Sequence, residues 1–159
     1  MLEKYFDELQ VGDIEITHRR TVTETDVTMW CMFTGDWFPI HSDGIYAEAS
    51  AFRQRIAPGV MVFAMAGGLA VPAQTRSIIA NYGSDRIRYP NPTFFGDTIH
   101  VVATVEKLQE RDTESGIADI RWEVKKQDDK TVCVIIMRIW LKSRSAMQLD
   151  SAVNSGVGS

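Results

Sequence analysis

The stretch FTGDWFPIHSD, residues 33–43, places a carboxylate and an imidazole close together in the chain. Asp36 and His41 are five residues apart, and on a continuous helix, at about 100° per residue, their side chains would point well away from each other. Gly35 permits a sharp turn and Pro39 fixes a backbone angle just before the histidine, so a loop can bring the two together. A carboxylate that orients water and an imidazole that exchanges protons near neutral pH would then form a general-base pair.

The same spacing also fits an ordinary turn with a capping aspartate and a half-buried histidine. The flanking residues favour a loop in either case. Thr23 can cap a helix, supported by Asp26, that runs to about Phe33. Since Pro39 disfavours helical geometry at the residue before it, we expect residues 35–41 to form a loop.

A helix that is apolar on every side is expected after this loop. Ser42 or Asp43 can cap a short helix, and Pro58-Gly59 then turns the chain into the apolar stretch 60–71. Such a helix should be buried. The stretch is shorter than the ~20 residues needed to cross a membrane, so no membrane partner is expected.

The second half of the chain changes from a helical to an alternating hydrophobic period, which is typical of strands. A strand near 78–89 and three more would form a four-stranded antiparallel meander after the buried helix. This is an α+β arrangement in which the sheet can wrap the helix. The alternating apolar positions are Ile99, Val101, Ala103 and Val105 in one strand and Ile120, Trp122 and Val124 in the next, followed by the continuous run Val132–Ile136.

Composition limits the kinds of partner. The chain has 159 residues, a formal charge of −4 and a pI near 5.4, which argues against a nucleic-acid surface. We predict one domain, residues 1–143, and a flexible polar tail, residues 144–159. Cys31 and Cys133 read as buried thiols of a cytoplasmic protein. The other two histidines, His18 and His100, are expected on strand surfaces, and no metal site is predicted.

The wider block FTGDWFPIHSDGIYAEASAFRQRIAPGVM resembles the hydratase motif of the MaoC-like dehydratases, the (R)-specific enoyl-CoA hydratases. Farther on, NPTFFGDTI (91–99) is similar to a turn that opens a long strand in that family. The matching positions of the first block are Thr34, Gly35, Asp36, Pro39, Ile40, His41, Asp43, Ala47, Phe52, Ile56, Ala57 and Gly59.

This resemblance implies a hot dog fold, a long central helix wrapped by an antiparallel sheet, in a chain that forms a homodimer or a higher homo-oligomer. It implies that Asp36 and His41 activate one water for reversible hydration of a trans-2-enoyl thioester, giving the (R)-3-hydroxyacyl form. The backbone N–H of Gly59 would bind the developing enolate oxygen. No separate cofactor is implied, because coenzyme A enters as part of the substrate.

Three positions depart from the family pattern, and one of them is Gly67, where some hydratases have a serine near the thioester carbonyl. Phe38 stands where the family usually has asparagine, and Pro58 replaces the usual histidine before Gly59. Phe38, Pro39 and Met61 are expected to line the acyl pocket. The coenzyme A phosphates would be held by Arg88, although a solvated face explains that arginine equally well; the other candidates are Arg53, Arg55 and Arg86.

Two other functions stay open at this point. A hot dog thioesterase would need a carboxylate on the central helix, and residues 60–73 contain no Asp or Glu. A non-catalytic acyl-thioester binding or assembly subunit would keep the fold while Phe38 disables the site. The acyl chain, and the choice between coenzyme A and an acyl carrier protein, are open as well.

Overall fold

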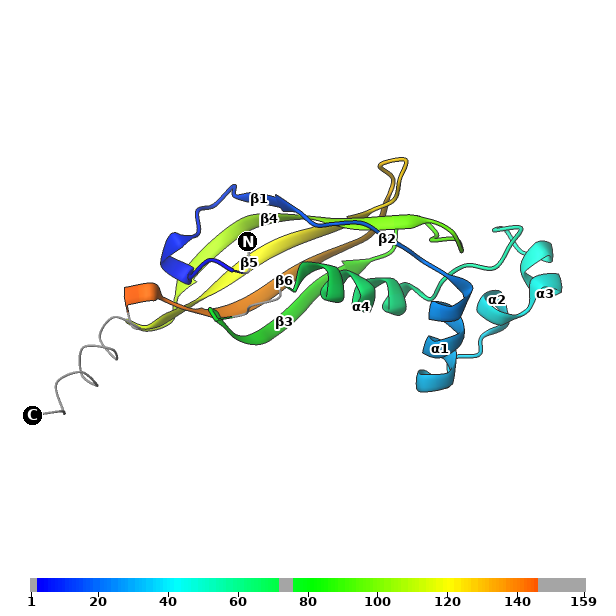
Figure 1. The fold of residues 1–159 in the computed structure, drawn as a ribbon, viewed down its shortest axis with the longest axis horizontal. Coiled ribbons are helices and arrows are strands. Elements are labelled where there is room, and N and C mark those ends of the chain that lie inside the picture. The colour runs from blue at the N-terminus through cyan, green and yellow to red at the C-terminus, as the bar shows by residue number, and fades with distance from the viewer. Residues whose placement is uncertain (1–2, 72–75, 146–159) are drawn as a thin grey trace, which may run out of the picture.

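The structure, a computed structural model, describes residues 3–71 and 76–145. One long helix lies against a strongly curved sheet, and three shorter helices stand beyond one end of that sheet (Figure 1). The elements in chain order are η1 (Phe6–Glu8), β1 (Ile14–Ile16), β2 (Arg20–Thr21), α1 (Glu24–Thr34), α2 (Pro39–Ser42), α3 (Gly44–Ala49), α4 (Gly59–Ala70), β3 (Ile78–Arg88), β4 (Thr98–Glu110), β5 (Ser115–Lys125) and β6 (Thr131–Lys142).

The sheet is antiparallel with the order β1-β4-β5-β6-β3, and β2 pairs with β4 off this path. The strands β4, β5 and β6 form the expected meander. The prediction that the strand near 78–89 joins it in sequence order is wrong, because β3 pairs with β6. The segment between β3 and β4 crosses the sheet, so strands β5 and β6 lie between those two strands.

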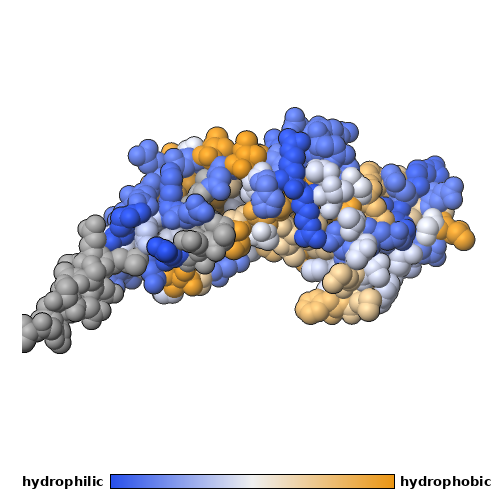
Figure 2. Space-filling view, in the orientation of Figure 1, coloured by the Kyte–Doolittle hydropathy of each residue, from blue (hydrophilic) through white to orange (hydrophobic). Residues whose placement is uncertain are grey.

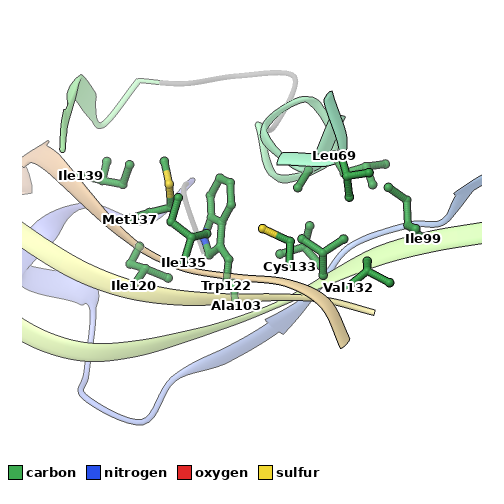
Figure 3. Packing of buried hydrophobic residues seen from close by; sticks show 14 of the residues in the cluster. Leu69, Ile99, Ala103, Ile120, Trp122, Val132, Cys133, Ile135, Met137 and Ile139 are labelled. Atoms are coloured by element: carbon green, nitrogen blue, oxygen red, sulfur yellow. The ribbon is translucent and has the colours of Figure 1, made fainter. Parts of the chain in front are cut away.

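The core lies between α4 and the concave face of the sheet. Figure 3 shows Leu69 of α4 above Ile99, with Trp122 and Ile135 on the same side of the sheet. All the alternating positions predicted for β4 and β5 are buried, as expected for strands with one face in the core. Together with the wrapped helix, this confirms the α+β hot dog fold (Figures 1 and 3).

Helix α4 is not buried on every side in the single chain. Leu69 and Met61 face the core, being 6% and 3% exposed, whereas Val60 and Val71 are 57% and 53% exposed. The exposed residues recur with the period of a helix, and together they form one apolar stripe: Val60, Ala64, Gly68 and Val71. The prediction of complete burial is therefore wrong, because one layer of sheet covers only one face of a helix.

The helices α1, α2 and α3 form a helical arm, residues 23–56, beyond the end of the sheet (Figure 1). The predicted cap is confirmed: Thr23 Oγ1 accepts the N–H of Asp26, and the Asp26 carboxylate accepts the N–H of Thr23. Gly35 ends α1 with a φ of 77°, a left-handed conformation that suits glycine. The predicted loop 35–41 is too long, since α2 already begins at Pro39, a residue favoured at a first helical position.

The two ends of the described chain meet on the side of the molecule away from the helical arm. Arg144 Nε donates to the Glu8 carboxylate at 2.6 Å, and the Arg144 N–H donates to Asp7 at 2.9 Å. Residues 144–145, predicted as the start of a flexible tail, are thus fixed on the N-terminal segment; residues 146–159 lie outside the described part of the chain. Among residues 3–71 and 76–145, no helix is long and apolar enough to span a membrane.

Candidate active site

His41 is held by a hydrogen bond to the backbone of a distant segment. Its Nδ1 lies 2.8 Å from the carbonyl oxygen of Ile56. A carbonyl can only accept, so Nδ1 must carry a proton, and in the neutral imidazole the lone pair is then on Nε2. The arrangement thus selects the tautomer in which Nε2 can take a proton from a bound molecule.

Ile56 and the residue after it connect the histidine to the rest of the fold. The Ile56 N–H donates to the carbonyl of Ile40 at 3.2 Å, and Ile56 forms a β-bridge with Phe94. The next residue, Ala57, donates its N–H to the carbonyl of Thr93 at 2.8 Å. His41 is therefore fixed, through Ile56, to the turn that leads into β4.

That turn, residues 93–97, holds both ends of the helical arm. The carbonyl of Asp97 accepts the N–H of Val22, just before α1, while Thr93 binds Ala57, just before α4. The Asp97 carboxylate lies 2.9 Å from the ammonium of Lys126, and both side chains are at least nine-tenths buried. Burial alone would raise the pKa of Asp97, but hydrogen bonds from the Phe94 N–H and from the Gln127 and Lys126 side chains outweigh it and lower that pKa.

Asp36 lies in the short loop between α1 and α2 and is half-buried. Its N–H donates to the Thr34 hydroxyl at 3.2 Å, which shapes the loop after Gly35. Burial raises the pKa of the neighbouring Cys31 thiol, and the negative charge of Asp36 raises it further. Cys31 also lines a small cavity of about 100 Å³ with His41, whereas Asp36 does not line it. The other residues lining this cavity are Glu24, Val27, Thr28, Trp37, Ser42, Arg55 and Phe95.

Gly59 begins α4 beside a larger cavity of about 380 Å³. The ring of Tyr89 packs directly on it, and a Cβ atom at this position would lie 3.0 Å from three ring carbons. A side chain here would require the Tyr89 ring to move by a few tenths of an ångström. The N–H groups in the first turn of α4 have no acceptor within the helix, and they lie at its positive end. The cavity is lined by Phe52, Ile56, Ala57, Gly59, Val62, Tyr89, Pro90, Asn91, Pro92, Thr93 and Val132.

The structure divides the predicted site residues into two groups. His41 and Gly59 are linked through Ile56, yet the cavity beside Gly59 is not lined by Asp36 or His41. Phe38 and Pro39 lie next to His41, at the start of α2. The roles of these residues in binding or catalysis stay predictions.

Neither Met61 nor Arg88, two of the predicted substrate contacts, lines the cavity beside Gly59. Met61 faces the core, whereas its neighbour Val62 lines the cavity beside Gly59, because successive helical residues point in different directions. Arg88 is exposed at the end of β3 and donates to the carbonyl of Ile87 at 2.8 Å. Arg55, a second candidate for phosphate binding, is already paired with Glu24 at 2.6 Å.

The sequence pointed to neither the Ile56 carbonyl nor Tyr89. A backbone carbonyl has no residue-type signal, and Tyr89 reaches Gly59 only through the fold. The surface position predicted for His100 is wrong: it is 5% exposed, and burial lowers its pKa, assisted by Arg19 and Lys125 and opposed by Asp129. Within the described part of the chain, no group of three or more His, Cys, Asp or Glu side chains is placed to hold a metal ion.

The fold defines this chain as a hot dog domain, and comparison with known proteins identifies its family. The model of the MaoC like domain matches residues 11–126, so the chain belongs to the MaoC-like family. It is 42% identical to protein MaoC of Klebsiella aerogenes over 104 residues, which are 65% of this chain and 31% of that protein. The chain thus spans about a third of the length of this relative.

In two further comparisons, the match covers most of the length of the other protein. An (R)-specific enoyl-CoA hydratase of Rhodospirillum rubrum is 27% identical over 106 residues, which are 65% of this chain and 71% of that enzyme. The solved structure of an Archaeoglobus protein, described as a monoamine oxidase regulatory protein, is similar with a TM-score of 0.82 and 32% identity. The match covers 88% of this chain and 95% of the Archaeoglobus chain.

Proposed function

We propose that this domain catalyses the reversible addition of water to a trans-2-enoyl thioester, giving a 3-hydroxyacyl thioester. The observation that carries the proposal is the hydrogen bond from His41 Nδ1 to the Ile56 carbonyl, which leaves Nε2 as the proton acceptor. Asp36 supplies a carboxylate from the adjoining loop. Membership of the MaoC-like family supports the same chemistry.

In the hydration direction, Asp36 and His41 hold one water molecule and remove a proton from it. The water oxygen bonds to C3, and the electrons of the C2–C3 double bond move toward the thioester carbonyl oxygen. A proton is then delivered to C2, so the product contains all the atoms of the water. Dehydration of the 3-hydroxyacyl thioester follows the same steps in reverse.

The Gly59 N–H is the proposed donor to the enolate oxygen that develops during this reaction. It lies at the N-terminus of α4, where the helix dipole favours negative charge. Pro58, which stands before it, lacks an N–H but leaves the Gly59 donor in place. The largely apolar cavity beside Gly59 suits an acyl chain.

We further propose a coenzyme A thioester as the substrate and the (R) form as the hydroxy product. The relative from Rhodospirillum rubrum, an (R)-specific enoyl-CoA hydratase by name, supports both. Coenzyme A would arrive with the acyl group, so the reaction needs no separate cofactor. Phe38 and Pro39, at the start of α2, would border the acyl group near His41.

A homodimer is proposed on the basis of two uncovered surfaces. Among the described residues, the 11-residue strand β3 pairs only with β6 and leaves its other edge open. Long open edges favour pairing with another strand. The apolar stripe of α4, with Val60 57% exposed, is also uncovered in the single chain.

The oligomeric state can be tested with Ala64→Glu, because Ala64 lies in that stripe and is exposed in a single chain. A charged side chain there would be in water in a monomer, but its burial in an apolar interface would destabilise a dimer. We expect the wild-type protein to sediment as a dimer and the variant as a folded monomer. A dimeric Ala64→Glu protein would show that the stripe is not the interface.

The activity is tested by incubating the purified protein with crotonyl-CoA. Loss of the conjugated double bond is followed by absorbance, and free thiol is assayed in parallel. Hydration removes the double bond without releasing thiol, which is the expected result. Thiol release would indicate a thioesterase, whereas binding without either change would indicate a non-catalytic subunit.

A further inference from the structure

Phe38 makes ring contacts with two residues of the helical arm. Its ring centroid is 6.0 Å from that of His41, with an angle of 75° between the ring planes. The ring centroid of Tyr46 is 6.2 Å from that of Phe38, at an angle of 67°. Both are edge-to-face contacts, the arrangement that aromatic pairs prefer.

The single hydrogen bond at Nδ1 does not by itself fix the His41 ring. It holds one nitrogen at 2.8 Å from the Ile56 carbonyl, but the ring can still tilt about that contact. A tilt moves Nε2, which lies on the far side of the imidazole. A second contact on the ring is needed to give Nε2 one direction, and Phe38 makes that contact.

Phe38 is itself held by its backbone and by Tyr46. Its carbonyl accepts the N–H of His41 at 2.9 Å, which closes the first turn of α2. Tyr46 is fixed in turn because its N–H donates to the Asp43 carboxylate at 3.1 Å. The Phe38 side chain is 54% exposed, so burial in a core does not explain its position.

We propose that Phe38, supported by Tyr46, is a positioning residue that fixes the plane of the His41 imidazole and the direction of Nε2. This inference rests on the proposed hydratase function, but it concerns a residue outside the proton-transfer steps. Small errors in the placement of a reacting group lower the rate of the chemical step much more than they weaken substrate binding. The effect of losing the ring is therefore expected in kcat.

The decisive variant is Phe38→Leu, which keeps an apolar side chain but removes the aromatic ring. With crotonyl-CoA as substrate, we expect kcat to fall about 10- to 100-fold. KM should change much less, because leucine keeps an apolar side chain beside the acyl group. Phe38→Tyr keeps the ring and should restore kcat. Phe33→Leu makes the same substitution in the same arm at a residue that is 88% exposed, and it should leave both constants unchanged.

A spectroscopic measurement tests the contact without using activity. An aromatic ring about 6 Å away shifts the NMR signals of the His41 ring protons. Phe38→Leu should therefore move these signals while those of His18 and His100 stay in place. His41→Ala assigns the signals, and circular dichroism confirms that each variant is folded.

The outcomes separate this inference from the proposed function. Unchanged kcat and unchanged His41 signals in Phe38→Leu would overturn the inference and leave the hydratase function standing. A rise in KM with an unchanged kcat would also overturn it, because Phe38 would then contact the substrate only. If the wild-type protein hydrates no enoyl-CoA, the proposed function fails, whereas unchanged His41 signals in Phe38→Leu would still overturn the ring contact on which this inference rests.

Discussion

The helical arm and the helix-sheet core use apolar residues in different ways. In the core, Ile135 of β6 and Ile120 of β5 are completely buried. In the arm, Ile45 of α3 is 85% exposed and Phe33 of α1 is 88% exposed. Figure 2 shows an apolar bulge at the position that α1 has in Figure 1, and the exposed apolar residues of α1 are Met29, Met32 and Phe33.

This difference separates what holds the fold together from what forms the site. The core is stabilised by burial of apolar surface, whereas the arm buries only a few side chains, such as Val27 and Cys31. Hydrogen bonds at Thr23, His41 and Asp43 add to these contacts. Residues of the arm can therefore change activity without changing the core. The junction between the two regions is the turn 93–97, which binds both ends of the arm.

The largest effect is expected from the catalytic pair, because its loss should abolish activity while the core stays intact. Asp36→Asn and His41→Ala should each lower the hydration rate by about 10²- to 10⁴-fold, since each removes a proton-transfer group. The midpoint of thermal unfolding should hardly change. The matched control is His18→Ala, an exposed histidine outside the arm. Full activity in either site variant would disprove the assignment.

The difference in burial between the core and the arm can be tested by making the same substitution, isoleucine to alanine, in each region and comparing the loss of stability. Ile135→Ala should lower the free energy of unfolding by about 2–5 kcal/mol, because it leaves a cavity in the core. Ile45→Ala should change it by less than about 0.5 kcal/mol, since that side chain is largely in water. Urea unfolding followed by circular dichroism measures both values. Equal destabilisation would mean that α3 is covered in solution.

Asp97→Asn tests the junction. The pKa of Asp97 is lowered in the folded protein, so its carboxylate adds stability above the ordinary carboxyl pKa of about 3.9, and this is lost as pH falls through the folded value. At pH 7 the variant should be less stable by about 1.5–3 kcal/mol, because Lys126 loses its charged partner. Unfolding curves measured from pH 7 down to about pH 2 should converge at the acid end. A difference that is constant across this range would contradict the role of the charge.

The smallest effect is expected at the start of the arm. Thr23→Ala removes the side-chain acceptor of the Asp26 N–H and should destabilise α1 by about 1 kcal/mol. Amide hydrogen exchange should become faster in the first turn of α1 and stay unchanged in β5. Faster exchange throughout the sheet would show that the arm and the core unfold together.

Local patterns made much of the fold predictable. The alternation of apolar residues placed Ile99 and Trp122 in the core, because the side-chain period of a strand is independent of the rest of the fold. The partner of β3 was not predictable, since pairing depends on the path of the chain between strands. The exposed stripe of α4 was not predictable for a related reason. An apolar sequence shows that a helix favours burial, but it does not show whether a single chain has enough residues to bury every face.

The sequence by itself determined that Asp36 and His41 do not share one continuous helix, because Gly35 and Pro39 set the local backbone there. Only the tertiary structure decided which atom His41 contacts. The Ile56 carbonyl fixes its tautomer and Phe38 packs against its ring. Neither contact can be identified from residue types. Every residue has the same backbone carbonyl, so only the fold shows which one reaches His41, and the ring contact forms only because the turn of α2 brings the Phe38 ring close to His41.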